Sequence, residues 1–266
     1  MDLSGIKMVV TDMDGTLLNS NHEVSKHFFN LFEKMKQKGI LFVAASGRQY
    51  HSMLSKLEPI KNDMLFIAEN GAIVKDGNKE LLVKPLSTSL LDTLMQKIET
   101  VDGCHVMLCG KYTSYFDGSS SKFLDMLKEY YSAYKIVDNF KDVTDEILKV
   151  AVYHSISAEE YIYPALKDLE NQVKVKVSGQ HWVDLNHINA HKGNALQHVM
   201  NHYGIQSDEV LVFGDYNNDI EMLSLVDYSF AMANAHYNVK KVASYTTKSN
   251  DEFGVENIIE LLLKAI

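Results

Sequence analysis

Two aspartates separated by one residue stand near the start of the chain, directly after a mostly apolar run at 6–10. In an extended segment, side chains two positions apart point to the same side, so the carboxylates of Asp12 and Asp14 converge on one spot. Gly15 and Thr16 then let the backbone turn away. Converging carboxylates can carry acid–base chemistry or bind a cation, whereas the same residues also form ordinary turns after strands. The rest of the chain has to distinguish these two readings.

Polar residues also follow two other apolar runs, 40–45 and 210–213, and a lysine opens a predicted helix just before the second run. The carboxyl ends of parallel strands meet along one edge of a sheet. We therefore expect these polar groups to lie beside the aspartate pair. They are Ser46 with Gly47, Lys192, and Asp215 with Asp219.

The elements that position these groups alternate along the chain. Short apolar segments typical of buried strands are separated by segments of helical periodicity, which predicts an α/β core with a parallel sheet. The alternation stops after residue 83 and resumes near residue 191. The predicted strands are 6–10, 40–45, 64–68, 210–213 and 228–232, and the predicted helices are 25–39, 49–57, 191–203, 220–225, 238–243 and 255–263.

The middle of the chain has a different pattern, in which paired short strands are interleaved with helices. This pattern predicts a separate α+β unit at 84–187, inserted into a core formed by 1–83 and 188–266. Its predicted helices are 89–98, 121–134 and 159–171, and its predicted strands are 105–109, 113–116, 150–156, 173–178 and 181–185.

Composition limits the classes of partner. The chain has 266 residues, a net charge of -9 and a pI near 5.6, so it carries no basic field for nucleic acid or an anionic membrane. No signal peptide or membrane span is recognisable, and we expect a cytoplasmic protein with no obligate protein partner. Cys104 and Cys109 are five residues apart, which predicts free thiols on opposite faces of a strand.

Together the polar clusters resemble the four motifs of the haloacid dehalogenase-like phosphohydrolases, which are D-x-D-G-T, a Ser or Thr, a Lys, and G-D-x-x-N-D. The segments S-G-R, E-N-G-A, H-K-G-N-A-L and G-D-Y-N-N-D-I-E-M-L are similar to the Cof-type branch, and within it to bacterial sugar phosphatases. The resemblance implies a Rossmann-like core with an inserted α+β cap domain. Tyr216 and Asn217 depart from it, because small residues or glycine are usual there.

The resemblance also implies the chemistry of the aspartate pair. Asp12 would attack the phosphorus and form an aspartyl phosphate, and Asp14 would protonate the leaving alkoxide and later activate water. Two neighbouring carboxylates disfavour ionising together, which would help Asp14 to hold its proton. Lys192 would lie between Asp12 and a phosphate oxygen.

A Mg²⁺ ion is the implied cofactor, because an anionic phosphate has to approach a carboxylate. The implied metal-site residues are Asp12, Asp14, Asp215 and Asp219. Asp12 and Asp215 would bind through their carboxylates and Asp14 through its backbone carbonyl, with Asn218 and Asp219 orienting the ligand shell or its waters. The remaining phosphate or substrate contacts would come from Ser46 and the backbone N–H of Gly47 at a helix start, and from Arg48, Asn70 and Gly71.

Each of these residues also has a plain structural reading, such as a solvated lysine, a helix cap or a charge near a helix dipole. The combination favours a Mg²⁺-dependent phosphomonoester hydrolase of small phosphorylated metabolites, sugar phosphates first. A phosphomutase and a metabolite-binding regulator stay open as alternatives. The pairs His187 with His191 and His198 with His202 have metal-binding spacing but no third ligand, and Tyr112, His181 and Trp182 are candidate substrate contacts in the cap.

Overall fold

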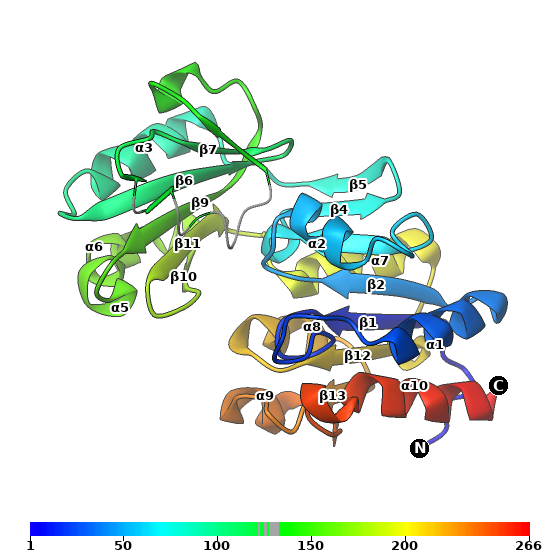
Figure 1. Cartoon of the computed structure of the whole chain (residues 1–266). Helices are drawn as coiled ribbons and strands as arrows, with labels where there is room; N and C mark the ends of the chain where they lie inside the picture. The colour runs from blue at the N-terminus through cyan, green and yellow to red at the C-terminus, as the bar shows by residue number, and fades with distance from the viewer. Residues whose placement is uncertain (122, 125–126, 128–132) are drawn as a thin grey trace. The chain divides into compact units, whose positions relative to one another are not determined.

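The computed structural model describes residues 1–121, 123–124, 127 and 133–266. The chain divides into two compact units, one made of Met1–Leu82 with His191–Ile266 and the other of Val83–Ala190. Each unit is described by itself (Figure 1). Among the described residues, none of the helices has the length and apolar character needed to cross a membrane.

The first unit is built on an eight-stranded sheet with the order β14-β13-β12-β1-β2-β3-β4-β5. The strands from β14 to β3 are parallel, and β4 is antiparallel to β3. This arrangement confirms the predicted parallel core. The strands are β1 Met8–Asp12, β2 Leu41–Ala45, β3 Leu65–Ala68, β4 Ile73–Asp76, β5 Lys79–Val83, β12 Val210–Gly214, β13 Tyr228–Ala231 and β14 Tyr245–Thr246.

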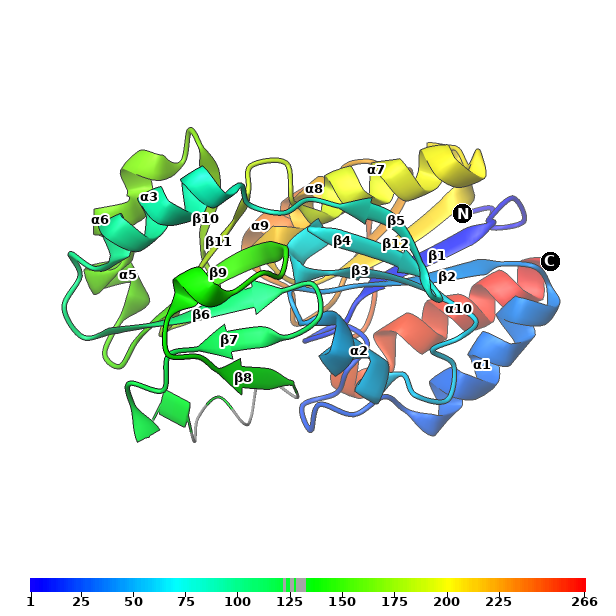
Figure 2. The same ribbon diagram turned by 90° about the horizontal axis from the view of Figure 1, so that it is seen from above.

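Helices cover both faces of this sheet. Helices α1 (Lys26–Gln37), α2 (Tyr50–Lys56) and α10 (Gly254–Ala265) lie on one face, and α7 (Lys192–Tyr203) and α8 (Ile220–Leu223) lie on the other (Figure 2). A further helix, α9, spans Tyr237–Val242 and contacts α8.

Helix α1 shows why these segments fold where they do. The Ser25 hydroxyl accepts a hydrogen bond from the backbone N–H of Phe28, which satisfies one of the free donors at the helix start. The apolar stripe of α1 is buried, and the rings of Phe28 and Phe32 pack on Phe42 of β2 at 5.1 and 5.8 Å between centroids. This packing fixes the helix against the sheet beside the strand that ends at the site.

The second unit contains a six-stranded sheet with the order β10-β11-β9-β6-β7-β8. Its helices α3, α5 and α6 pack their apolar side chains against one face of this sheet. The elements are α3 Thr88–Ile98, β6 Cys104–Gly110, β7 Ser114–Phe116, β8 Tyr134–Ile136, β9 Ile147–His154, α5 Ala158–Tyr161, α6 Tyr163–Leu166, β10 Val173–Val177 and β11 Trp182–His187.

Three expectations for this unit meet different outcomes. The continuous helix predicted at 159–171 is wrong, because the segment forms α5, α6 and a 3-10 turn at Lys167–Leu169, and Pro164 at the start of α6 has no N–H to extend a helix. The predicted helix at 121–134 lies partly outside the described residues. Cys104 and Cys109 form no disulfide and belong to hydrophobic clusters on different faces of the sheet, as predicted.

Candidate active site

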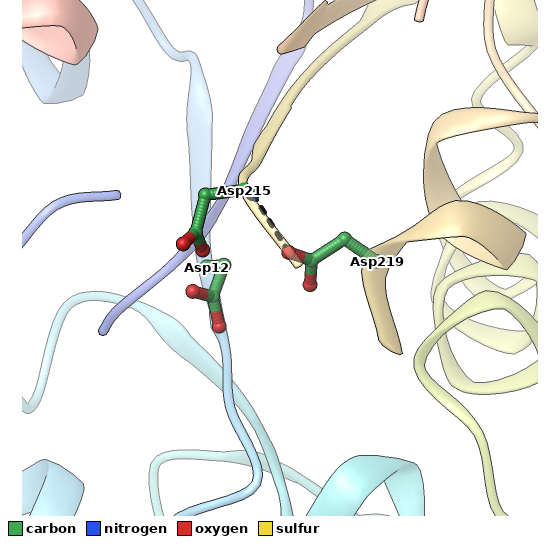
Figure 3. Close-up of side chains that lie close together, drawn as sticks. All are labelled: Asp12, Asp215 and Asp219. Atoms are coloured by element: carbon green, nitrogen blue, oxygen red, sulfur yellow. Dashed lines mark hydrogen bonds between the residues drawn. The ribbon is translucent and has the colours of Figure 1, made fainter. Parts of the chain in front are cut away.

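Three carboxylates meet at the carboxyl ends of two neighbouring parallel strands. Asp12 is the last residue of β1, Asp215 directly follows β12, and Asp219 lies in the turn after it. One oxygen from each carboxylate lies within 4.8 Å of the others (Figure 3). The expectation that strand ends bring the aspartates together is thereby met for Asp12 and Asp215.

A buried lysine lies against two of these carboxylates. The Nζ atom of Lys192, the first residue of α7, lies 2.5 Å from Asp12 Oδ1 and 2.6 Å from Asp219 Oδ1. The side chain is 0% exposed. Burial would lower the pKa of the ammonium, but the two carboxylates raise it above its usual value, so the group stays protonated. Lys192 therefore brings a fixed positive charge to the carboxylate that ends β1.

Asp219 uses both carboxylate oxygens within the protein. Its Oδ2 accepts hydrogen bonds from the backbone N–H of Asp215 at 2.9 Å and of Tyr216 at 3.0 Å, while Oδ1 accepts from Lys192. The first of these bonds is drawn in Figure 3. Asp219 therefore fixes the loop that carries Asp215, and it holds the lysine. The Tyr216 side chain is 49% exposed, so the unusual residue at this position is accommodated at the surface.

The carboxylates of Asp12 and Asp215 form an electrostatically strained pair. Burial raises the pKa of Asp12 well above its usual range, more than the charge of Lys192 lowers it. Burial, followed by the charge of Asp219, raises the pKa of Asp215 to about 6. The hydroxyl of Thr16 donates to Asp215 Oδ1 at 3.1 Å. Buried negative charge of this density is relieved by a cation, and an all-oxygen donor set suits Mg²⁺.

The loop after β1 leaves space for this pair only because residue 15 is glycine. Gly15 has φ +75, and a Cβ atom there would lie within 2.3 Å of Asp215 Oδ2. The side-chain amide of Asn234 donates to the carbonyl of Gly15 at 2.8 Å. The residues present thus fit a divalent cation bound by Asp12 and Asp215.

Asp14 is engaged by an arginine. Arg48 Nε and Nη2 donate to the two carboxylate oxygens of Asp14 at 2.7 and 2.5 Å, and His22 Nδ1 lies 3.5 Å from Asp14 Oδ1. Burial alone would raise the pKa of Asp14, but the hydrogen bonds and charge of Arg48 outweigh it, so the pKa lies below its usual value. The expectation that its neighbour helps Asp14 to hold a proton is therefore wrong for this structure, because the contact with Arg48 dominates.

The predicted phosphate-side residues lie at the ends of β2 and β3. Ser46 is buried, its Oγ accepts from the backbone N–H of Arg48 at 3.1 Å, and its carbonyl accepts from the N–H of Asn70 at 3.0 Å. The expected helix start at Ser46 and Gly47 is wrong, since α2 begins at Tyr50. The segment 46–49 is instead a loop held against the next strand end.

The segment after β3 contacts the loop 215–219, which follows β12. Asn218 Nδ2 donates to Asn70 Oδ1 at 3.3 Å, and a Cβ atom at Gly71 would lie 2.5 Å from the carbonyl oxygen of His191. Asn70 and Gly71 have φ values of 57 and 95, a left-handed backbone that favours asparagine and glycine. The structure therefore joins Asn70, Gly71 and Asn218 to the segment that carries Lys192.

Sequence reasoning missed several contributors to this site. Thr16 lies within the D-x-D-G-T motif, so the motif itself could have indicated a role for its hydroxyl. His22 and Asn234 carry no local signal, because their positions depend on loops that approach the first strand from elsewhere in the chain. Of the four histidines with metal-binding spacing, His191 caps α7 by accepting from the N–H of Asn194 at 3.2 Å, and His198 Nε2 lies 2.9 Å from the carbonyl oxygen of Leu81.

Comparisons with known proteins agree with this geometry. Residues 9–259 match the sequence model of the haloacid dehalogenase-like hydrolase family. The Escherichia coli K12 protein 5-amino-6-(5-phospho-D-ribitylamino)uracil phosphatase YbjI is 34% identical over 97% of each chain. A Streptococcus mutans UA159 crystal structure has a TM-score of 0.89 at 31% identity, covering 97% of this chain and 99% of that one. A sugar phosphatase of subclass IIB of this superfamily has a TM-score of 0.83 at 20% identity, covering 98% of this chain and 100% of that one, which shows the fold alone.

Proposed function

Because the chain belongs to the haloacid dehalogenase-like hydrolases and to their Cof-type phosphatases, we propose that it hydrolyses small phosphomonoesters with Mg²⁺, through an aspartyl phosphate. The observation that carries the proposal is the placement of Lys192, whose buried ammonium contacts Asp12 and Asp219 beside Asp215. A structural ion pair would need one carboxylate, whereas this site collects three around one lysine. Such an excess of buried negative charge suits a site that works with a metal ion.

In the proposed first step, a carboxylate oxygen of Asp12 attacks phosphorus in line with the ester bond. A new bond forms between that oxygen and phosphorus, the ester P–O bond breaks, and the leaving oxygen takes a proton from Asp14. Asp14 has to take up that proton before the step, because the contact with Arg48 lowers its pKa in the structure. In the second step, the oxygen of a water molecule bonds to phosphorus while Asp14 accepts a proton from that water. The bond between phosphorus and the Asp12 oxygen breaks. Lys192 holds Asp12 in place and offsets the negative charge of the phosphoryl group.

The metal site in this proposal consists of the carboxylates of Asp12 and Asp215 and the backbone carbonyl of Asp14. Mg²⁺ bound there would supply the positive charge that lets a phosphate dianion approach two carboxylates. Asp219 is assigned a different role from the one expected, because both of its oxygens are already engaged. It orients Lys192 and the loop of Asp215.

For the substrate we propose phosphate esters of sugars or sugar alcohols. The name of the 34% identical relative refers to a phosphoribityl group attached to an aminouracil, which makes this compound the second candidate substrate. We further propose that the unit at 83–190 acts as the cap that selects the organic part of the substrate. Tyr112, His181 and Trp182 are the side chains in that unit to substitute first.

A panel assay tests the proposal. The protein is incubated with Mg²⁺ and individual sugar phosphates, sugar-alcohol phosphates and the phosphoribitylaminouracil, and inorganic phosphate is followed. We expect release that EDTA stops and that Asp12→Asn abolishes. Binding without release would replace the hydrolase by a metabolite-binding regulator, and an isomerised sugar phosphate would indicate a phosphomutase.

A further inference from the structure

Arg48 is the only arginine in the chain. The sequence has 26 lysines and arginines in all, and all of them except Arg48 are lysines. Lysine is a compact point charge, whereas the planar guanidinium presents several donors in a fixed fork that matches the two oxygens of a carboxylate. The one arginine of this chain lies where the fork of a guanidinium contacts a carboxylate, that of Asp14.

The fork of Arg48 is occupied by Asp14. Nε donates to Oδ2 at 2.7 Å and Nη2 donates to Oδ1 at 2.5 Å, so each carboxylate oxygen has its own donor. The third side of the guanidinium is anchored by Ser52 of α2, whose hydroxyl lies 3.3 Å from Nη1. The arginine backbone is fixed as well, since its N–H donates to Ser46 Oγ and its carbonyl accepts from Glu69 N–H at 3.0 Å.

His22 approaches the same carboxylate from a separate loop. Its Nδ1 atom lies 3.5 Å from Asp14 Oδ1, and its own backbone has φ 56. The N–H of His22 donates to the carbonyl of Asn19, and its carbonyl accepts from Lys56 Nζ, both at 2.8 Å. Asp14 thus lies between the guanidinium of Arg48 and the imidazole of His22, on two well-anchored segments, and the two-point contact with Arg48 fixes the plane of its carboxylate.

We propose that Arg48 is a positioning residue that acts through Asp14, and that contact with the substrate phosphate is not its main role. The inference rests on the proposed function, in which Asp14 gives a proton to the leaving oxygen and takes one from water. Both transfers need the carboxylate at a defined orientation, and a misplacement of about 1 Å can cost about 100-fold in rate. Lys192 already supplies the fixed charge next to Asp12, so the fork of Arg48 supplies orientation.

A double-mutant cycle separates positioning from phosphate binding. We expect Arg48→Lys, which keeps the charge and loses the fork, to lower kcat by about 10- to 100-fold while KM changes by less than about threefold. In an Asp14→Ala background, Arg48→Lys should cause no further loss of p-nitrophenyl phosphate turnover, whose leaving group needs no added proton. Lys36→Arg, which makes the reverse exchange at the exposed Lys36–Asp63 pair, is the matched control and should leave kcat unchanged.

Two further readouts keep the test independent of folding. Added guanidinium should restore part of the activity of Arg48→Ala, and the same concentration of ammonium should not. Since the chain has one arginine, protein labelled with ¹⁵N-arginine gives one Nε–H resonance, which should shift in Asp14→Asn and stay in place in Lys36→Met, a control that adds no second arginine. This spectrum reports on the contact even in a protein without turnover.

The proposal is overturned if the effects of Arg48→Lys and Asp14→Ala multiply, or if inhibition by inorganic phosphate weakens in parallel with kcat/KM. Either result would make Arg48 a phosphate ligand. An unchanged Nε–H resonance in Asp14→Asn would remove the contact itself. Wild-type protein that fails to release phosphate would instead contradict the proposed hydrolase, whatever the spectrum shows.

Discussion

Replacing Lys192 by methionine leaves two buried carboxylates without their shared cation. Removing one partner of a buried ion pair costs about 3–5 kcal/mol. Lys192 serves both Asp12 and Asp219, but burial already raises the pKa of Asp12, so this carboxyl can take up a proton instead of staying charged. We therefore expect the cost of one broken pair, about 3–5 kcal/mol at pH 8, and not twice that amount.

The direction of the pH dependence follows from the same carboxylates. Without Lys192 the folded-state pKa of Asp12 rises further, because the charge of Lys192 no longer lowers it, and a carboxyl with a raised pKa contributes stability only while it is protonated. The variant should therefore be least stable relative to wild type at pH 8 and should recover part of the loss at pH 5. Wild-type protein keeps the ammonium of Lys192 beside both carboxylates at both pH values.

Urea unfolding of the wild type and Lys192→Met at pH 8 and pH 5, without metal, measures these differences. The matched control is Lys36→Met, which removes an exposed, solvent-screened ion pair and should leave stability nearly unchanged. A loss in Lys192→Met no larger than that of the control at pH 8 would refute the reasoning. It would mean that the buried ammonium is not what neutralises Asp12 and Asp219.

Three further predictions concern the proposed metal site. Gly15→Ala should abolish stabilisation by Mg²⁺, because its Cβ would lie 2.3 Å from Asp215 Oδ2; an unchanged Mg²⁺ titration of Tm would contradict this. Asp219→Asn should weaken Mg²⁺ affinity less than Asp215→Asn does while still abolishing turnover; calorimetry showing equal losses of affinity would restore Asp219 as a ligand. Burial raises the pKa of Asp215 to about 6. In metal-free protein the stability contributed by the protonated carboxyl is therefore lost as the pH rises to that value, and below it protons compete with Mg²⁺. The gain in Tm from Mg²⁺ should grow between pH 5 and 7, and a flat gain would contradict the assignment of Asp215 as a metal ligand.

The parallel core could be predicted because each of its strands is a short apolar run that ends in polar residues. That rule also brought Asp12, Asp215 and Lys192 to one edge of the sheet. The rule places strand ends and says little about the segments that follow them. The helix predicted at 49–57 is α2, Tyr50–Lys56, but the placement of Ser46 and Gly47 at its start is wrong, because a loop at 46–49 precedes it. The hairpin of β4 and β5 was missed, because its strands are short and partly exposed.

The partner of Asp14 could not be predicted from local sequence. Neighbouring carboxylates at 12 and 14 suggest mutual repulsion, but the dominant contact comes from Arg48, a long side chain on a different strand end. Its direction depends on how Ser52 and the Glu69 turn anchor it, which no periodicity encodes. The same limit applies to Asp219. Its carboxylate is of a type that binds metal ions, but its two oxygens accept hydrogen bonds from Lys192 and from two backbone N–H groups.

The most direct test of the aspartyl-phosphate mechanism is an acid-quenched single turnover with ³²P-labelled p-nitrophenyl phosphate and Mg²⁺. The account predicts that label appears on the protein before it appears as inorganic phosphate, that it maps to the peptide containing Asp12, and that it accumulates in Asp14→Asn. Release of inorganic phosphate with no labelled protein at any time in either form, or a label that persists in Asp12→Asn, would contradict it.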